Sequence, residues 1–144
     1  PKGIVTMLKH YKIDLAGKSA VVIGRSMIVG RPMSYLLTNH DATVTLAHSR
    51  TPDLRRFTRT ADIVIAAIGK AKFLDATYFD AARPPIVVDV GMNHDENGAL
   101  CGDVHFDQVQ GIAKAITPVP GGVGPMTIYS LAENLLTAAE RSLC

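Results

Sequence analysis

The sequence predicts an α/β fold in which a doubly wound, mostly parallel sheet carries helices on both faces. Short apolar runs that end in glycine recur along the chain, as "SAVVIG", "ADIVIAAIG" and "PPIVVDVG". Continuous runs rich in β-branched residues are typical of parallel strands that are covered on both faces. Segments with helical periodicity lie between these runs, and 144 residues that are 47% hydrophobic and 19% charged fit one globular domain.

The first half of the chain contains a strand–helix–strand unit. Apolar residues recur at helical spacing from Gly3 to Tyr11, which predicts an amphipathic helix before the first strand, "SAVVIG". A glycine turn then leads into a helix that reaches Asn39, with Pro32 in the first turn, where proline is tolerated. "ATVTLAH" follows as the second strand and completes the unit at the expected length.

The second half adds two strands, an arm and a long helix. The strands "ADIVIAAIG" and "PPIVVDVG" are separated by a short helical stretch, "DATYFDAA". The turn signal Asn97-Gly98 within "NHDENGALCGDV" predicts a hairpin that leaves the sheet. The segment "ITPVPGGVGPMT" is rich in proline and glycine, and a closing helix runs from about Met126 to Arg141.

Composition excludes several classes of function. The net charge of +2, without a basic run interleaved with aromatics, argues against nucleic acid as a partner, and no apolar run is long enough for a membrane span or patterned as a signal peptide. Cys101 and Cys144 are too few for a disulfide framework, so a reducing, cytoplasmic location is expected. Cys101 and His105 form the only pair at metal-ligand spacing, and no metal site is expected. The chain begins without an initiator methionine, which suggests part of a longer protein.

The segment from Val21 to Met33, "VVIGRSMIVGRPM", follows the first strand and opens the next helix. It is close to the dinucleotide pattern G-x-G-x-x-G, but Ser26 replaces the second glycine and Gly30 comes one residue late. In this position a Rossmann-type domain presents backbone N–H groups and a helix N-terminus to a phosphate. Gly24 would make the tight turn, while Arg25 and Ser26 can bind phosphate oxygens directly. The alternative is a tight turn without a ligand.

The end of the second strand indicates which dinucleotide binds. Ribose hydroxyls are usually held there by Asp or Glu, whereas a 2′-phosphate requires cationic or hydroxyl groups. This chain has His48, Ser49, Arg50 and Thr51 and no carboxylate. The pattern favours NADP over NAD. Asp53, the nearest acidic residue, keeps NAD open, and a solvated polar turn is the alternative without a ligand.

Other polar residues give no sign of a nucleophilic or metal centre. Ser26 lacks the G-x-S-x-G elbow of a serine hydrolase. Asp62 is most simply a residue at the entry of a strand. Asp89, two residues before Gly91, could orient a loop at the ligand edge, but a structural use is the better interpretation.

Three segments, "GRSMIVGRPM", "HSRT" and "TPVPGGVGPMT", together resemble the bifunctional methylenetetrahydrofolate dehydrogenase/methenyltetrahydrofolate cyclohydrolase family. The string "PGGVGPMT" is highly specific, and the similarity extends over the whole chain, from "PKGI" through "ADIVIAAIGK" to "VVDVGMN". The resemblance implies that residues 1–144 are the C-terminal NAD(P)-binding domain. The enzyme would oxidise 5,10-methylenetetrahydrofolate with NADP and hydrolyse the methenyl product to 10-formyltetrahydrofolate.

The resemblance also implies roles for individual residues. Those expected to contact the cofactor are Gly24, Arg25 and Ser26 at the phosphates, Ser49 and Arg50 at the 2′-phosphate, Met92 near the nicotinamide half, and Thr127. Those expected at the substrate rim are Pro120, Gly121 and Gly122. The catalytic Lys and Tyr of the family belong to an N-terminal folate domain, which is absent from this chain. None of its own residues is therefore expected to be catalytic.

Further expectations concern partners and activity. The linker helices, at about 3–11 and 126–141, would contact the folate domain, so their apolar faces should be partly exposed in this chain. The family pairs through this domain, which implies a homodimer, and the folate substrate would bind through the missing domain. The isolated chain is expected to be inactive. Two alternatives remain: a non-catalytic nucleotide-binding or interaction module, and another two-domain NAD(P)-dependent dehydrogenase.

Overall fold

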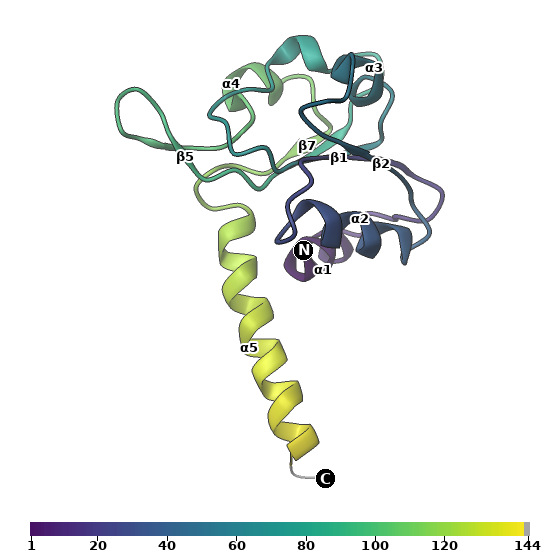
Figure 1. Cartoon of the computed structure of the whole chain (residues 1–144), viewed down its shortest axis with the longest axis vertical. Helices are drawn as coiled ribbons and strands as arrows, with labels where there is room; N and C mark the ends of the chain where they lie inside the picture. Colours follow the sequence, from purple (N-terminus) through teal and green to yellow (C-terminus); the bar gives the residue numbers. More distant parts are fainter. Residues whose placement is uncertain (143–144) are drawn as a thin grey trace.

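The computed structural model describes residues 1–142 and is built around a five-stranded sheet (Figure 1). All neighbouring strands are parallel. In spatial order they are β2 (Thr43–Ala47), β1 (Ser19–Ile23), β3 (Ile63–Ala66), β4 (Ile86–Asp89) and β7 (Ala115–Ile116). The chain moves from β1 to β2 on one side and then crosses to β3 on the other, so β1 lies at the topological switch point where α/β sheets bind ligands.

Helices cover both faces of this sheet, which confirms the predicted doubly wound architecture. Packed on one face are α1 (Lys2–His10) and α2 (Gly30–Thr38). On the other face are α3 (Leu54–Thr58), the 3₁₀-helix η1 (Ala76–Tyr78) and α4 (Phe106–Val109). The last helix, α5 (Val123–Ser142), extends away from the sheet (Figure 1).

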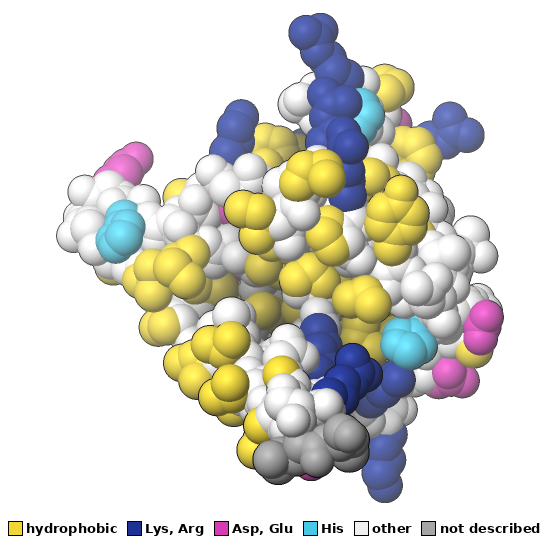
Figure 2. Space-filling model, turned by 60° about the horizontal axis from the view of Figure 1, so that its bottom comes forward, with side chains coloured by type: hydrophobic (Ala, Val, Ile, Leu, Met, Phe, Trp, Pro, Cys, Tyr) yellow, Lys and Arg dark blue, Asp and Glu magenta, His cyan; other side chains and the backbone are white. Residues whose placement is uncertain are grey.

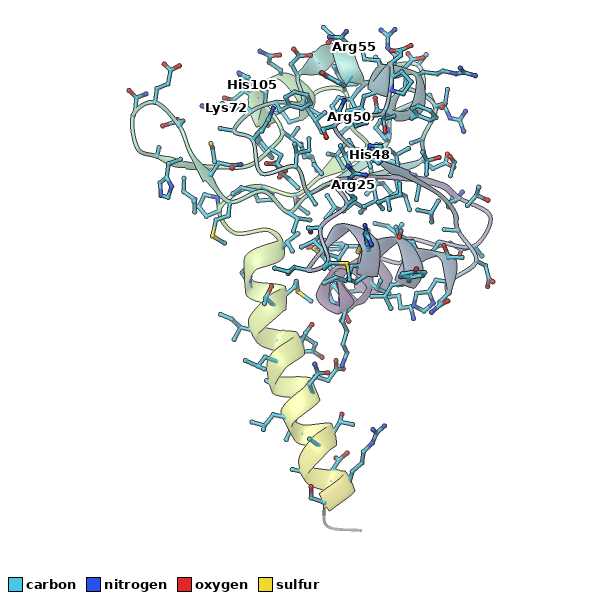
Figure 3. The ribbon with its side chains drawn as sticks, in the orientation of Figure 1. Arg25, His48, Arg50, Arg55, Lys72 and His105 are labelled. Carbon is cyan, nitrogen blue, oxygen red and sulfur yellow. The ribbon has the colours of Figure 1, made fainter. Side chains whose placement is uncertain are left out.

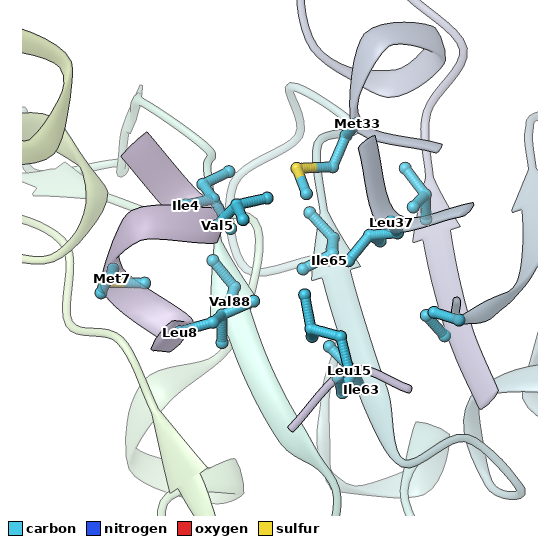
Figure 4. Close-up of a cluster of buried hydrophobic side chains, with 13 residues drawn as sticks. Ile4, Val5, Met7, Leu8, Leu15, Met33, Leu37, Ile63, Ile65 and Val88 are labelled. Carbon is cyan, nitrogen blue, oxygen red and sulfur yellow. The ribbon is translucent and has the colours of Figure 1, made fainter. Parts of the chain in front are cut away.

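The continuous apolar strands supply the cores on both faces. Successive side chains of a strand point to opposite faces, so Ala20 and Val22 of β1 face α1 and α2, while Val21 and Ile23 face α3 and α4. Burial of a large aliphatic side chain stabilises the fold by about 1.5–3 kcal/mol. Figure 4 shows the first of these cores, in which Ile63, Ile65 and Val88 of the sheet meet Ile4, Leu8, Met33 and Leu37 of the helices.

Three short elements and one helix start were missed from the sequence. Helices α3 and α4 contain five and four residues and β7 contains two, too few for a periodic pattern to be recognised. Helix α5 begins at Val123 rather than at Met126. Its first turn contains Gly124 and Pro125, which resemble a loop in sequence, but proline is tolerated there because its missing N–H would have no helical partner.

The predicted hairpin is present and stands away from the sheet (Figure 1). Strands β5 (Asn93–His94) and β6 (Leu100–Cys101) pair antiparallel. At the tip, the Asp95 carboxylate accepts N–H groups from Asn97 and Ala99, both at 3.0 Å, and Gly98 has a φ of 78°. The turn therefore uses the residues that the sequence indicated.

The helices α1 and α5, which were expected to contact a folate domain, differ in the apolar side chains that they expose. The expectation of an exposed apolar face is wrong for α1, because its apolar side chains pack on the sheet and are buried: Ile4, Val5, Met7 and Leu8. It is confirmed for α5, where four aliphatic side chains are 66–74% exposed: Ile128, Leu131, Leu135 and Leu136. Hydrophobic side chains gather along this helix at the lower left of Figure 2. The helices cross closely, because a Cβ on Gly3 would lie 2.7 Å from the Met126 carbonyl oxygen.

The cysteines, a possible membrane span and possible metal ligands were the other features considered in the sequence. Cys101 is a free, buried thiol, and Cys144 lies outside the described residues. Across residues 1–142, no helix combines the length and apolar character needed to cross a membrane. Within the same range, no three His, Cys, Asp or Glu side chains come together as metal ligands.

Candidate cofactor site

Because the strands are parallel, the loops that follow them meet at one edge of the sheet. Most of the predicted site residues lie in these loops: Gly24, Arg25 and Ser26 after β1, Ser49 and Arg50 after β2, Met92 after β4, and Pro120, Gly121 and Gly122 after β7. Thr127 lies apart from the loops, within α5, and is exposed. This edge of the sheet therefore brings together most of the residues that were predicted from the sequence to contact the cofactor or the substrate.

The loop between β1 and α2 is closed by two glycines that approach other backbone atoms. Gly24 has a φ of +117°, and a Cβ at this position would overlap the carbonyl oxygen of Ala67 at the end of β3. A Cβ on Gly30 would in turn overlap the carbonyl oxygen of Gly24. Gly30 is thus one residue later than in the usual pattern, yet it serves the same close packing between loop and helix.

Ser26 has a local role that the sequence did not reveal. Its Oγ accepts the N–H groups of Val29 at 3.1 Å and Gly30 at 3.4 Å, and its carbonyl oxygen accepts the N–H of Arg31 at 3.0 Å. Pro32, the next residue, has no N–H. The first N–H groups of α2 are thus already bonded within the loop, and the expectation that this helix N-terminus meets a phosphate stays a prediction.

The donors that remain are in the loop itself. In the described chain, the backbone N–H groups of residues 25–28 donate to no protein acceptor. The side chains of these four residues are exposed, among them the Arg25 guanidinium. Ser26 also keeps its hydroxyl proton, since the contacts above use only its oxygen as an acceptor. Together these groups can donate to a phosphate from one short segment.

The turn after β2 is held in shape by its own side chains. Thr51 Oγ1 accepts the His48 N–H at 2.9 Å, and His48 Nδ1 accepts the Arg50 N–H at 3.1 Å. Ser49 and Arg50 take no part through their side chains, which are exposed. The turn therefore presents a hydroxyl and a guanidinium outward on a fixed backbone.

This turn lies directly beside the β1 loop. The Gly24 N–H donates to the Ala47 carbonyl oxygen at 2.8 Å, which joins the ends of the two strands. Figure 3 labels Arg25, His48 and Arg50 on this part of the molecule. A phosphate on the adenosine ribose and the pyrophosphate of one dinucleotide can thus be served by neighbouring loops.

Asp89, the last residue of β4, is a buried carboxylate that holds three backbone segments. It is 3% exposed and accepts N–H groups from Gly91 at 2.8 Å, Asp103 at 3.0 Å and Val104 at 2.8 Å. Burial raises the pKa of Asp89 above its ordinary value, and the nearby Asp103 carboxylate adds to this rise, whereas the three N–H donors oppose it. The structural role expected for Asp89 is therefore confirmed, and that role includes orienting Gly91 at the cofactor edge.

Asp103 is a second buried carboxylate, which the sequence analysis missed. It is 0% exposed and accepts N–H groups from Ile68, Gly69 and Lys70 in the turn after β3. The Asn93 side-chain amide donates to it at 2.9 Å. The acid in the apolar stretch "LCGDV" was the available signal, but nothing in the sequence identified its partners.

The segment after β7 forms the last part of the edge. Thr117 Oγ1 accepts the Asp89 N–H at 2.8 Å, which ties this segment to β4. A Cβ on Gly122 would lie 2.5 Å from the Pro118 carbonyl oxygen, whereas one on Gly121, at a φ of +99°, would meet open space. Of the two glycines expected to permit close approach, Gly122 has the close neighbour within this chain.

A cavity of about 250 Å³ opens beside this edge, between the hairpin, the start of α4 and the segment after β7, and Asp89 and Thr117 are among its lining residues. Lys72 and His105 line it and lie apart from Arg25 and Arg50 in Figure 3. None of the predicted cofactor residues lines this cavity. The geometry around β1 and β2, rather than this cavity, matches the chemistry of a nucleotide.

Residues 1–143 match the family model described as the NAD(P)-binding domain of tetrahydrofolate dehydrogenase/cyclohydrolase. The chain belongs to this family. It is 58% identical to "Bifunctional protein FolD" of Lactiplantibacillus plantarum over 142 residues, which cover 99% of this chain and 49% of that protein. The chain thus spans about half the length of the curated relatives that it matches.

Solved structures of this family share the fold. The bifunctional FolD enzyme of Campylobacter jejuni superposes with a TM-score of 0.95 at 48% identity, over 99% of this chain and 50% of that one. The Trypanosoma brucei enzyme, solved with NADP and an inhibitor, gives 0.89 at 39% identity, over 99% and 50%. The predicted Rossmann-type fold and family membership are confirmed.

Proposed function

We propose that this chain is the NADP-binding domain of an enzyme that oxidises 5,10-methylenetetrahydrofolate and hydrolyses the methenyl product to 10-formyltetrahydrofolate. One observation carries the proposal: a glycine-closed loop, whose N–H groups at residues 25–28 have no protein acceptor within residues 1–142, lies beside a turn that presents Ser49 and Arg50 and no carboxylate. The family and the NADP complex of the Trypanosoma brucei relative support it. No observation favours a non-catalytic module or another dehydrogenase.

Preference for NADP over NAD is the first expected result. We expect Arg50→Ala to weaken NADP binding by roughly 10- to 150-fold, because a hydrogen bond to a charged group contributes about 1.5–3 kcal/mol. NAD lacks the 2′-phosphate, so its affinity should change little. Calorimetric titration of the wild type and the variant with both nucleotides measures this difference.

Arg59→Ala provides the matched control, since Arg59 is also an exposed arginine but follows α3 instead of lying in the turn after β2. It removes the same charge and should leave both affinities nearly unchanged. Equal weakening of NADP and NAD by Arg50→Ala would contradict the role of Arg50. Equal affinities of the wild type for the two nucleotides would contradict the cofactor assignment.

Catalysis is proposed to require the part of the relatives that this chain does not cover. Hydride transfer needs the folate carbon held against the nicotinamide, and such positioning can supply about 7–11 kcal/mol of the barrier. We expect no NADPH or methenyl product from the 144-residue chain alone, and turnover when the folate-binding half of a relative is added. Absorbance detects both products. Turnover by the chain alone that disappears in Arg25→Ala would contradict the proposal.

Self-association through the hairpin is also part of the proposal. Strands β5 and β6 form a two-stranded unit of their own, and exposed strand edges recruit partners. We expect a dimer in sedimentation at micromolar concentration, and a shift toward monomer in Leu100→Asp, because Leu100 is a partly exposed apolar side chain of β6. A wild-type monomer would contradict this proposal.

A reducing, cytoplasmic location is proposed as well, supported by the free thiol of Cys101.

A further inference from the structure

We propose that Asp103 is a positioning residue for the nicotinamide half of the bound cofactor. The inference rests on the proposed NADP-binding function and extends it to a side chain that the nucleotide itself need not touch. Asp103 is fully buried below the surface formed by the loops after β3 and β4. Its role follows from where a dinucleotide must run along the edge and from what holds that part of the edge in place.

The order of the strands sets the direction of the cofactor. With the 2′-phosphate at the turn after β2 and the pyrophosphate at the loop after β1, the rest of the molecule extends over β3 and β4, which follow β1 on its other side. Neighbouring strands lie about 4.8 Å apart, so β2 to β4 spans roughly 14 Å, a length that an extended dinucleotide can cover. The nicotinamide half therefore lies over the residues that follow β3 and β4.

The turn after β3 depends on Asp103 for its shape. On either side of this stretch, the Ala67 N–H and, two residues after its end, the Lys72 N–H donate to backbone carbonyl oxygens. Between them, the N–H groups of Ile68, Gly69 and Lys70 all donate to the Asp103 carboxylate and to no other acceptor in residues 1–142. A single side chain thus takes the place of a sheet or helix partner for three consecutive residues.

The same carboxylate also holds the segment after β4. The Asn93 amide at the base of the hairpin donates to it, and a Cβ on Gly91 would lie 2.5 Å from its Oδ1. Asp103 is itself anchored, because its N–H donates to Asp89 and its carbonyl oxygen accepts the Leu74 N–H at 2.9 Å. The Asp103 carboxylate therefore holds both loops that face the nicotinamide half in fixed positions.

Asp103→Asn tests this role with two ligands. Asparagine keeps the size of the side chain, but its NH₂ group would face N–H donors and only one acceptor oxygen would remain. Loss of a charge-assisted contact is expected to weaken NADP binding by roughly tenfold or more. Adenosine 2′,5′-bisphosphate reaches only the loops after β2 and β1, so its affinity should change by less than about twofold. Calorimetry gives the ratio of the two affinities.

Asp62→Asn is the matched control. Asp62 Oδ2 also accepts a backbone N–H, from Ser19 at 2.9 Å, but at the opposite edge of the sheet. Destabilisation alone should change the affinities for NADP and the bisphosphate by the same factor in either variant. The positioning role is supported if the affinity for NADP divided by that for the bisphosphate is lower in Asp103→Asn than in the wild type and unchanged in Asp62→Asn. An unchanged ratio in Asp103→Asn overturns it.

A measurement on the wild type covers the case in which Asp103→Asn fails to fold. In amide NMR spectra, NADP should shift the signals of Ile68, Gly69 and Lys70, and the bisphosphate should leave them in place. Equal shifts with both ligands, or none with NADP, would overturn the role even though NADP binds. If the wild type binds neither ligand, the proposed cofactor is wrong, and the role of Asp103 falls with it.

Discussion

Gly24→Ala is expected to lower the free energy of unfolding by about 3 kcal/mol or more and to remove measurable NADP binding. A φ of +117° is strained for any residue with a Cβ, at about 1–3 kcal/mol. The added methyl would also overlap the Ala67 carbonyl oxygen, and overpacking of this kind adds about 1–3 kcal/mol. Relief of the overlap would separate the β1 loop from the end of β3, where the dinucleotide is proposed to cross. Urea unfolding and calorimetric titration measure the two effects.

Gly17→Ala separates strain from overlap. Gly17 also has a positive φ, 71°, but a Cβ there would meet nothing within 4 Å. The free energy of unfolding of this variant should fall by only about 1–2 kcal/mol, because alanine is strained in the left-handed conformation. It should bind NADP like the wild type, because Gly17 precedes β1 and lies away from the cofactor edge. Similar losses of stability and affinity in the two variants would show that close packing at Gly24 is unimportant.

Asp89→Ala is expected to be the second most damaging change, with a loss of about 3 kcal/mol or more in the free energy of unfolding. The variant leaves the N–H groups of Gly91, Asp103 and Val104 without their acceptor in the interior. Each buried donor left without a partner lowers the free energy of unfolding by about 1–3 kcal/mol. Since these donors belong to three segments at one edge, we also expect weaker NADP binding. Thermal and urea unfolding give the loss of stability.

The control for Asp89 is the same substitution at Asp75. The Asp75 carboxylate also accepts a backbone N–H, from Thr77 at 2.9 Å, but at the exposed start of η1. Water can replace that contact, so Asp75→Ala should lose only about 1 kcal/mol, as is usual for a capping residue. If Asp89→Ala were no more damaging than Asp75→Ala, burial of the carboxylate would not be the source of its effect.

Local patterns were sufficient for much of the fold. The strands β1, β3 and β4 were predicted because a strand covered on both faces must be apolar throughout, as in Ile63–Ala66. The hairpin was predicted because Asn97-Gly98 suits a tight turn. The shortest elements, α3, α4 and β7, were missed because they form through contacts with the sheet, and their few residues carry no period of their own.

The candidate site divides in the same way. Sequence alone determined the position of the nucleotide loop and the missing carboxylate after β2, because both depend on residues that are adjacent in the chain. Only the tertiary structure decided that Ser26 accepts N–H groups within its own loop and that the apolar face of α1, expected from the sequence to be partly exposed, is buried. It also decided that Asp103 accepts N–H groups from residues 33 to 35 positions earlier. The physical reason is that a buried polar group is satisfied by whichever donors the packed strands bring to it, and a sequence does not display such partners until the chain has folded.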